Sequence, residues 1–332
     1  MNKWFVGGGT VAWKPDGGTI KEVKKLAERV AKVIQAVDPD VLTVQEGPSD
    51  RQEMALFVSD CLKNADGKPA FDILGGLDGG AQKPYILVKR GGAMTNPTLA
   101  SDDLSLALFD EWEADIDADA GLELYDYTRD PVIVDGKLKD TGEDIRIITL
   151  HTKSKYVHNG SAMWNDPNRR QQFIELALMA RRRISAEAMH TRRYLDLLCE
   201  KSPNLHVAIT GDFNDGPGYD FFERLYLTHG VADIMQGSLF RPGWQYKHVL
   251  IGNVPVNELF TALFYDFVDE IDRKLLLDHI LISPSLQNRF KNATIAHSEF
   301  EAQVLTSYAI GSRDRSPSDH RPVVVDITSS LQ

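Results

Sequence analysis

Apolar residues follow two different periods along the chain. Residues recurring at helical spacing predict helices over 19–38, 51–62 and 168–201. Short continuous apolar runs, which end at Gly, Pro or polar residues, predict buried strands over 41–44, 145–150, 205–209 and 323–327. Because strands and helices alternate from end to end with no linker or repeat, the pattern favours one α/β domain over residues 1–332.

Three segments lead to more specific expectations. Residues 275–282 read as one strand with Asp278 inside an apolar run, and an unpaired buried carboxylate is costly, so Asp278 needs a partner. Residues 240–267 are rich in aromatic residues without periodicity, which favours a loop that walls a pocket and sets specificity. Arginines recur every eleven residues on the long predicted helix, and we interpret their rows as a solvated face.

Polar residues stand at the ends of the predicted strands. The run 205–209 leads into Gly211-Asp212-Phe213-Asn214-Asp215 and then a Gly-Pro-Gly turn. Open α/β folds place their chemistry at such strand ends, although an Asx turn that only caps its own backbone uses the same residues. The other strand ends carry Gln45-Glu46, His151 with Lys153, Asp278, and Asp319-His320.

Composition and charge limit the classes of protein to which the chain can belong. The net charge is −11, which argues against binding nucleic acid by bulk attraction, and the hydrophobic fraction of 42% is ordinary for a globular protein with a core. The two cysteines, Cys61 and Cys199, lack the spacing of a metal or redox motif. No signal peptide or membrane segment is recognisable, so a cytoplasmic location is expected.

In order along the chain, the motifs QE, LHTK, GDFND, LDHILIS and SDHRPV resemble those of the endonuclease/exonuclease/phosphatase family from about residue 20 onward. GDFN and SDHRPV are the most specific of them. The resemblance implies a DNase I-like α/β fold, a four-layer sandwich in which two packed mixed β-sheets are flanked by helices. It also implies a metal-dependent phosphoesterase whose partner is a phosphate-ester substrate. A nuclease is slightly favoured.

Cleaving a phosphate ester requires a cation on the phosphoryl oxygens, an oriented water and stabilisation of negative charge. Mg²⁺ prefers carboxylate oxygens, so we assign Glu46 and Asp319 to the metal, with Mn²⁺ or Ca²⁺ as alternatives. The resemblance implies further roles: Asp212 activates water, Asn214 positions it, His320 contacts phosphate, Asp278 holds His320, His151 is a proton donor, and Arg129 approaches the phosphate. Lys153, beside His151, is a second candidate substrate-binding residue.

The chain departs from the family pattern at two places. Family members begin with a strand that ends in a metal-binding Asn, whereas here Asn2 is the only candidate and no strand precedes it. We therefore expect a domain that lacks its first strand, with a central sheet edge left unpaired. The acid that pairs with the first histidine should lie near Tyr85, but Lys83 and Pro84 stand there.

Two other functions remain as alternatives. GDFND also satisfies the GDxxD motif of calcineurin-like metallophosphoesterases, but the DxH and GNH motifs of that fold are missing from the sequence. A catalytically silent family member would use the fold to bind a partner. The substrate, the endo or exo mode of cleavage and the oligomeric state are not determined by the sequence.

Overall fold

The computed structural model describes residues 1, 3–76, 80–227, 229–306 and 312–328. Its largest sheet has six strands in the order β12-β15-β11-β10-β9-β6. β10 and β11 run parallel to each other, and every other pair of neighbouring strands in this sheet is antiparallel, so the sheet is mixed. The strands are β6 (Met94–Leu99), β9 (Val132–Leu138), β10 (Asp144–His151), β11 (His206–Asp212), β12 (Lys247–His248) and β15 (Asp278–Ile282).

A second layer of strands packs against this sheet. It consists of a three-stranded sheet in the order β3-β5-β4 and the antiparallel hairpin β16-β17. One apolar cluster joins the two layers and includes Ile86, Ile147, Ala208 and Ile280. The strands of this layer are β3 (Val41–Gly47), β4 (Phe71–Gly75), β5 (Lys83–Lys89), β16 (Phe290–Ile295) and β17 (Val323–Ile327).

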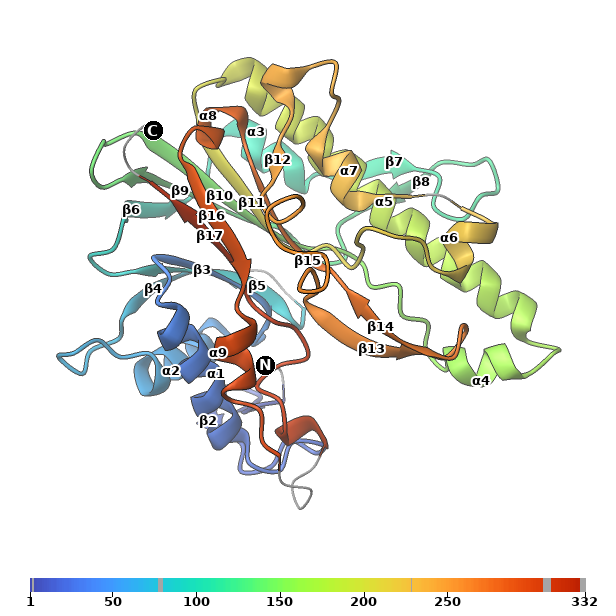
Figure 1. Cartoon of the computed structure of the whole chain (residues 1–332), viewed down its shortest axis with the longest axis horizontal. Coiled ribbons are helices and arrows are strands. Elements are labelled where there is room, and N and C mark those ends of the chain that lie inside the picture. Colours follow the sequence, from blue (N-terminus) through green and yellow to red (C-terminus); the bar gives the residue numbers. More distant parts are fainter. Residues whose placement is uncertain (2, 77–79, 228, 307–311, 329–332) are drawn as a thin grey trace.

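Helices cover both outer faces. α1 (Val23–Val37) and α2 (Arg51–Cys61) pack their apolar sides on the β3-β5-β4 sheet, and α5 (Arg170–Lys201) packs on the six-stranded sheet. Figure 1 shows the resulting sequence of helix, sheet, sheet and helix. The predicted four-layer α/β sandwich is therefore confirmed, and the three longest predicted helices lie within a few residues of their expected bounds.

Shorter elements fill the connections. Among the described residues, no helix combines the length and the apolar character needed to cross a bilayer. The remaining strands are β1 (Phe5–Gly7), β2 (Thr10–Trp13), β7 (Trp112–Ala114), β8 (Glu123–Tyr125), β13 (Ala262–Asp266) and β14 (Ile271–Leu275). The remaining α-helices are α3 (Asp103–Leu106), α4 (Gly160–Asn165), α6 (Phe221–Leu225), α7 (Val231–Gln236), α8 (Pro284–Gln287) and α9 (His297–Glu301). Single 3₁₀ turns cover Ala107–Phe109, Pro242–Trp244 and Ser312–Asp314.

The segment 275–282 is not the single strand that its apolar run predicts. β14 ends at Leu275 and β15 begins at Asp278, with Leu276 buried at the bend between them. Leu276 belongs to the core rather than to a strand, which periodicity alone does not distinguish. As a result Asp278 lies at a strand end, where its carboxylate can reach other groups.

The arginine rows of α5 are a solvated face only in part, because Arg170 and Arg193 are exposed whereas two others are buried. Arg181 and Arg192 are 3% and 6% exposed. Arg181 pairs with Asp220, and Arg192 pairs with Asp196 and donates to the carbonyl of Met235. These guanidinium groups hold the segments that follow β11 against the long helix.

Candidate active site

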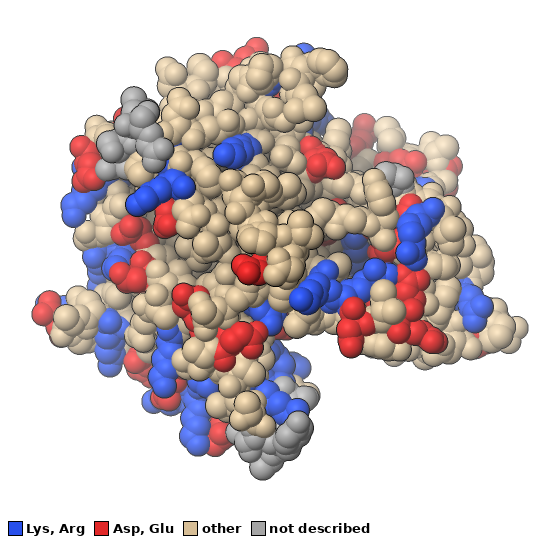
Figure 2. All heavy atoms as spheres, in the orientation of Figure 1, with Lys and Arg blue, Asp and Glu red and all other residues tan. Residues whose placement is uncertain are grey.

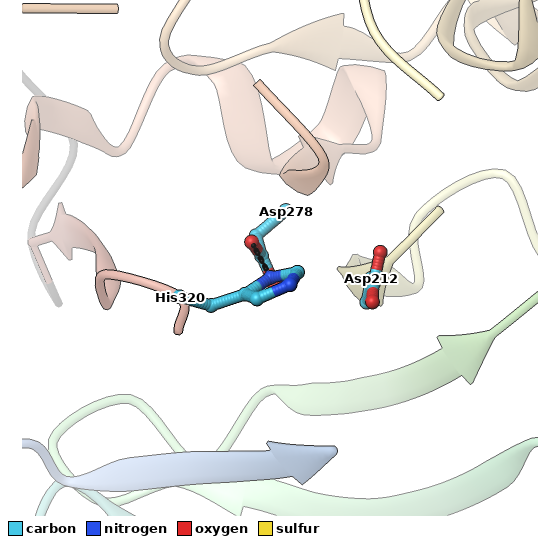
Figure 3. Close-up of side chains that lie close together, drawn as sticks. All are labelled: Asp212, Asp278 and His320. Carbon is cyan, nitrogen blue, oxygen red and sulfur yellow. Dashed lines mark hydrogen bonds and ion pairs between the residues drawn. The ribbon is translucent and has the colours of Figure 1, made fainter. Parts of the chain in front are cut away.

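Three neighbouring strands bring three candidate residues to one edge of the six-stranded sheet. His151 at the end of β10 lies opposite Asp212 at the end of β11, and Asp212 lies opposite Asp278 at the start of β15. His320 comes from the segment before β17 and forms a β-bridge with Ala262. In Figure 3 the imidazole of His320 lies between the carboxyl groups of Asp278 and Asp212.

Asp278 and His320 form a close ion pair. The Nδ1 of His320 lies 2.7 Å from the Oδ2 of Asp278. The Asp278 side chain is half-buried, and His320 is the partner that the sequence led us to expect. Burial alone would lower the pKa of His320, but the hydrogen bond and charge of Asp278, with the charge of Asp212, raise it to about 10. The imidazole is therefore cationic at neutral pH, and ligand atoms of all three residues lie within 4.8 Å of one another.

Asp212 is 7% exposed and is held by the turn that follows it. Its Oδ1 accepts a hydrogen bond of 2.8 Å from the backbone N–H of Asn214, which adopts φ 50°. Burial and the charge of Asp278 raise the pKa of Asp212 to about 7. Gly211 allows β11 to lie close against β10, because a Cβ at this position would lie 1.9 Å from the carbonyl oxygen of Leu150.

His151 differs from His320 in its charge. Its Nε2 lies 3.5 Å from the Oδ2 of Asp212, and its Nδ1 is buried with no hydrogen-bond partner among the described residues. Burial, together with the charges of Arg129 and His320, lowers the pKa of His151 to about 3. In the family pattern an acid near Tyr85 would pair with this histidine, and its absence from the sequence is consistent with the unpaired Nδ1. The hydroxyl of Tyr85 itself donates to the carbonyl of Pro48.

Arg129 and Glu46 are linked by a residue that the motifs do not reveal. The guanidinium of Arg129 donates to the Oε1 of Gln82 (2.9 Å), and the Nε2 of Gln82 donates to the Oε1 of Glu46 (2.9 Å). Arg129 also contacts the carbonyl of Thr152, which accepts a second hydrogen bond from the side chain of Asn214. Arg129 is thus tied to the Asp212 loop and, through Gln82, to Glu46.

Glu187 is a second residue that sequence reasoning missed. This fully buried carboxylate accepts hydrogen bonds from the backbone N–H groups of Thr128 and Lys153. It therefore fixes the two segments that carry Arg129 and Lys153. The sequence offers no signal for this, because Glu187 stands in the middle of a long helix among many other charged residues.

The two carboxylates assigned to a metal lie at the same end of the strands. Glu46 is the second-last residue of β3 and Asp319 precedes β17, and the charges of both act on the amino group of Met1. Both side chains are exposed, and oxygen donors of this kind suit Mg²⁺. The third candidate, Asn2, lies outside the described residues. The donor chemistry therefore fits a hard divalent cation.

Asp215, the second carboxylate of the GDFND motif, points away from this cluster. One of its oxygens lies 2.6 Å from the Nζ of Lys155, and the other accepts the backbone N–H of Val231. Lys155 also pairs with Glu223 at 2.6 Å. Asp215 therefore anchors the turn in a buried ionic network.

Comparison with known proteins agrees with this architecture. An endonuclease/exonuclease/phosphatase protein from Bacteroides vulgatus matches 96% of this chain over 95% of its own, at 13% identity and a TM-score of 0.51. The chain has the endonuclease/exonuclease/phosphatase fold. The predicted resemblance is confirmed at the level of fold.

Two further structures of this fold match with lower scores. The mannosyl-6-phosphatase of Bacteroides thetaiotaomicron is 17% identical (92% of this chain, 91% of that chain, TM-score 0.49). The D. rerio protein TDP2, complexed with a single-strand DNA product, is 11% identical (92% of each chain, TM-score 0.47). No protein-family model matches the sequence, and no curated protein does.

Proposed function

We propose that this protein is a divalent-metal-dependent phosphoesterase whose reaction centre is formed by Asp212, Asp278 and His320. One observation carries the proposal: a carboxyl group with a pKa near 7 and a cationic imidazole lie within 4.8 Å of each other at a strand edge. Hydrolysis of a phosphate ester needs a group that takes a proton from water and a positive charge that stabilises the phosphoryl oxygens.

Each residue has a role that its contacts support. Asp212 orients the attacking water and accepts its proton, since a catalytic base works best with a pKa near the working pH. Asp278 holds the Nδ1–H of His320, which leaves the Nε2–H free to donate to a phosphoryl oxygen. Asn214 helps to position the water, and its turn fixes the orientation of Asp212.

Three residues would act on the substrate around this centre. Arg129 supplies a second positive charge to the substrate phosphate. Lys153, on the segment that follows His151, supplies a third. His151 is neutral at physiological pH, so we assign it a hydrogen bond to the leaving-group oxygen instead of a charge interaction.

The cation would be held by Glu46 and Asp319, with Asn2 as a third ligand. Mg²⁺ is the ion we favour because the donors are hard carboxylate oxygens, with Mn²⁺ and Ca²⁺ as the alternatives. When bound, the ion neutralises the negative charge of the phosphoryl oxygens.

A phosphodiester is the substrate class that we favour. His151 and Arg129 match the residues that distinguish DNase-like members, so a nucleic acid is the first candidate. Figure 2 shows Lys and Arg interspersed with Asp and Glu on the face in view, without a broad basic surface there. With a net charge of −11, recognition would depend on local contacts at the site and not on long-range attraction.

A substrate panel tests the proposal. Bis(4-nitrophenyl) phosphate, 4-nitrophenyl phosphate, labelled DNA and RNA oligonucleotides and a phosphoinositide are assayed with Mg²⁺ and with EDTA. We expect Mg²⁺-dependent hydrolysis that Asp212→Ala and His320→Ala each reduce by at least about 10²-fold. The matched controls outside the site, the exposed Asp66→Ala and the half-buried His297→Ala, keep full activity. Hydrolysis that survives both site substitutions, or that EDTA leaves unchanged, would contradict the mechanism, and activity on no substrate would favour a silent binding module.

A further inference from the structure

Two buried histidines of the six-stranded sheet lie outside the reaction centre. His248 ends β12 and His279 is the second residue of β15, and the two residues are 3% and 1% exposed. Their rings are perpendicular to each other, and the Nε2 of His248 lies 2.8 Å from the Nδ1 of His279. Because a buried polar atom is costly unless it is hydrogen-bonded, the other nitrogen of each ring also needs a partner.

The backbone that follows β12 determines which nitrogen of each ring carries the proton. The N–H groups of Leu250 and Ile251 both donate to the Nδ1 of His248, each at 3.2 Å, so this nitrogen is an acceptor and the proton is on Nε2. The Nε2–H of His248 therefore donates to the Nδ1 of His279. His279 in turn carries its proton on Nε2, which lies 2.7 Å from the carbonyl oxygen of Asp215 and donates to it.

Both rings are neutral in this arrangement. A second proton on His279 would face the N–H of His248, and a second proton on His248 would face two backbone N–H groups. Burial lowers the pKa of His279, and burial together with the neighbouring His279 lowers the pKa of His248 to about 3. At neutral pH the hydrogen bonds therefore run in one direction, from the backbone beyond β12 to Asp215.

These hydrogen bonds end on the turn that carries the proposed catalytic residues. The ring of His279 also stacks on that of Phe213, with the centroids 4.9 Å apart and an angle of 16° between the planes. His279 thus contacts the turn on both sides of Asn214, whose backbone lies in the sparsely populated left-handed region at φ 50°. The N–H of Asn214 is the group that donates to the Oδ1 of Asp212, so contacts that hold the turn also hold this carboxyl group.

We propose that His279 is a positioning residue for the reaction of Asp212, and that His248 orients it by fixing its tautomer. The inference rests on the proposed function, in which the carboxyl group of Asp212 must be held toward the attacking water. Without the donor of His248, the proton of His279 could move to Nδ1, and the lone pair on Nε2 would then repel the carbonyl oxygen of Asp215. His279 directly follows Asp278, and successive side chains of a strand point to opposite faces. β15 therefore presents Asp278 on one face and supports the Asp212 turn from the other.

Ring-nitrogen NMR tests the direction of these hydrogen bonds without any activity measurement. In the unaltered protein we expect both histidines to be neutral and protonated on Nε2 between about pH 6 and pH 8. In His248→Phe, which removes the donor, part of the His279 population should shift to the Nδ1–H tautomer. A cationic His279, or one with its proton on Nδ1 in the unaltered protein, would overturn the proposal, and an unchanged tautomer in His248→Phe would overturn the role of His248.

Three variants test the effect on the turn. His279→Phe removes the hydrogen bonds but keeps a ring against Phe213, and His279→Gln supplies an amide N–H in place of the imidazole N–H. His206→Phe is the matched control, because His206 is also buried but begins β11, at the strand end opposite Asp212. Exchange of the Asn214 amide and the kcat and KM of hydrolysis are measured on each folded variant.

We expect His279→Phe to speed exchange of the Asn214 amide and to lower kcat, each by at least about tenfold, with little change in KM. His279→Gln should retain most of the protection and activity, and His206→Phe should change neither. Unchanged exchange or unchanged kcat in His279→Phe would overturn the proposal, as would equal losses in His206→Phe or in His279→Gln. Faster exchange in His279→Phe, in a protein that hydrolyses no substrate even when unaltered, would support the positioning of the turn and overturn the proposed function.

Discussion

Changing each of the two carboxylates of the GDFND motif to asparagine should have a different effect, one on activity and the other on stability. Asp212→Asn keeps the oxygen that accepts the N–H of Asn214, so the turn is preserved while the proposed base is lost. Asp215→Asn keeps the shape of a side chain that is 2% exposed but removes the charge opposite Lys155. The first substitution is therefore expected to abolish activity in a folded protein, and the second to weaken the fold.

The structure gives a sign and a magnitude for each stability effect. The pKa of Asp212 is raised from 3.8 to about 7, chiefly by burial, so its folded-state ionisation opposes folding above pH 3.8 and does so fully above about pH 7. At about 1.36 kcal/mol per pKa unit, Asp212→Asn should stabilise the metal-free protein at pH 8 by at most about 4 kcal/mol. Removing one partner of a buried ion pair costs about 3 kcal/mol, so Asp215→Asn should destabilise by about that amount.

The assay combines urea unfolding at pH 8 in EDTA with hydrolysis of the best substrate from the panel in Mg²⁺. Asp212→Asn should show a higher urea midpoint and a rate at least about 10²-fold below wild type. Asp215→Asn should show a lower midpoint and should keep most of its activity at temperatures where it is folded. A folded Asp212→Asn protein with near-normal activity would refute the role of Asp212 as base. An inactive Asp215→Asn protein of normal stability would refute the division between the two carboxylates.

Three further predictions follow from local geometry. Gly211→Ala should unfold the protein or lower its stability by more than about 4 kcal/mol in thermal melts, because the added Cβ would overlap the carbonyl of Leu150; a normal melting temperature would contradict the close strand approach. Burial raises the pKa of Glu223, but His229 and Lys155 lower it to about 2 overall. This carboxylate therefore contributes about 3 kcal/mol to the free energy of unfolding above pH 4.5, and the contribution is lost as the pH falls toward 2. The urea midpoint of Glu223→Gln should accordingly lie well below that of wild type at pH 7 and approach it on acidification, and an equal difference at pH 7 and pH 3 would contradict this. Arg129→Ala should raise the KM or lower the kcat of hydrolysis by about 10-fold to 10²-fold without a change in melting temperature, whereas Arg90→Ala, on an exposed guanidinium, should change neither.

The sequence predicted most of the architecture because the signals were local. Helical periodicity located α1 and α5 within a few residues, and the apolar runs located β3, β10 and β11. The cost of an unpaired buried carboxylate predicted that Asp278 needs a partner, and the family resemblance named His320, which lies 2.7 Å from it. The helix and strand predictions depended on side-chain period and on strand ends, which a linear sequence displays directly.

The contacts that support the site could not be predicted in the same way. Gln82 links Arg129 to Glu46 from a glycine-rich loop, and Glu187 holds Lys153 from the middle of α5. Both make hydrogen bonds across long sequence separations, which leave no periodic or motif signal. The burial of Arg181 was missed for the same reason, because its partner Asp220 belongs to a segment nearly forty residues later.

The position of the catalytic candidates follows from the register of three strands and not from any one motif. β10, β11 and β15 are aligned so that His151, Asp212 and Asp278 fall opposite one another, and a one-residue slip would turn each side chain to the other face of the sheet. Gly211 is compatible with that register where a residue with a side chain would not be, because β10 and β11 approach too closely there for a Cβ. The cationic state of His320 depends in turn on Asp278 being at the first position of β15. The chemistry proposed for the GDFND motif is therefore a property of the sheet edge as a whole, and substitutions that shift strand register should remove it even when every motif residue is intact.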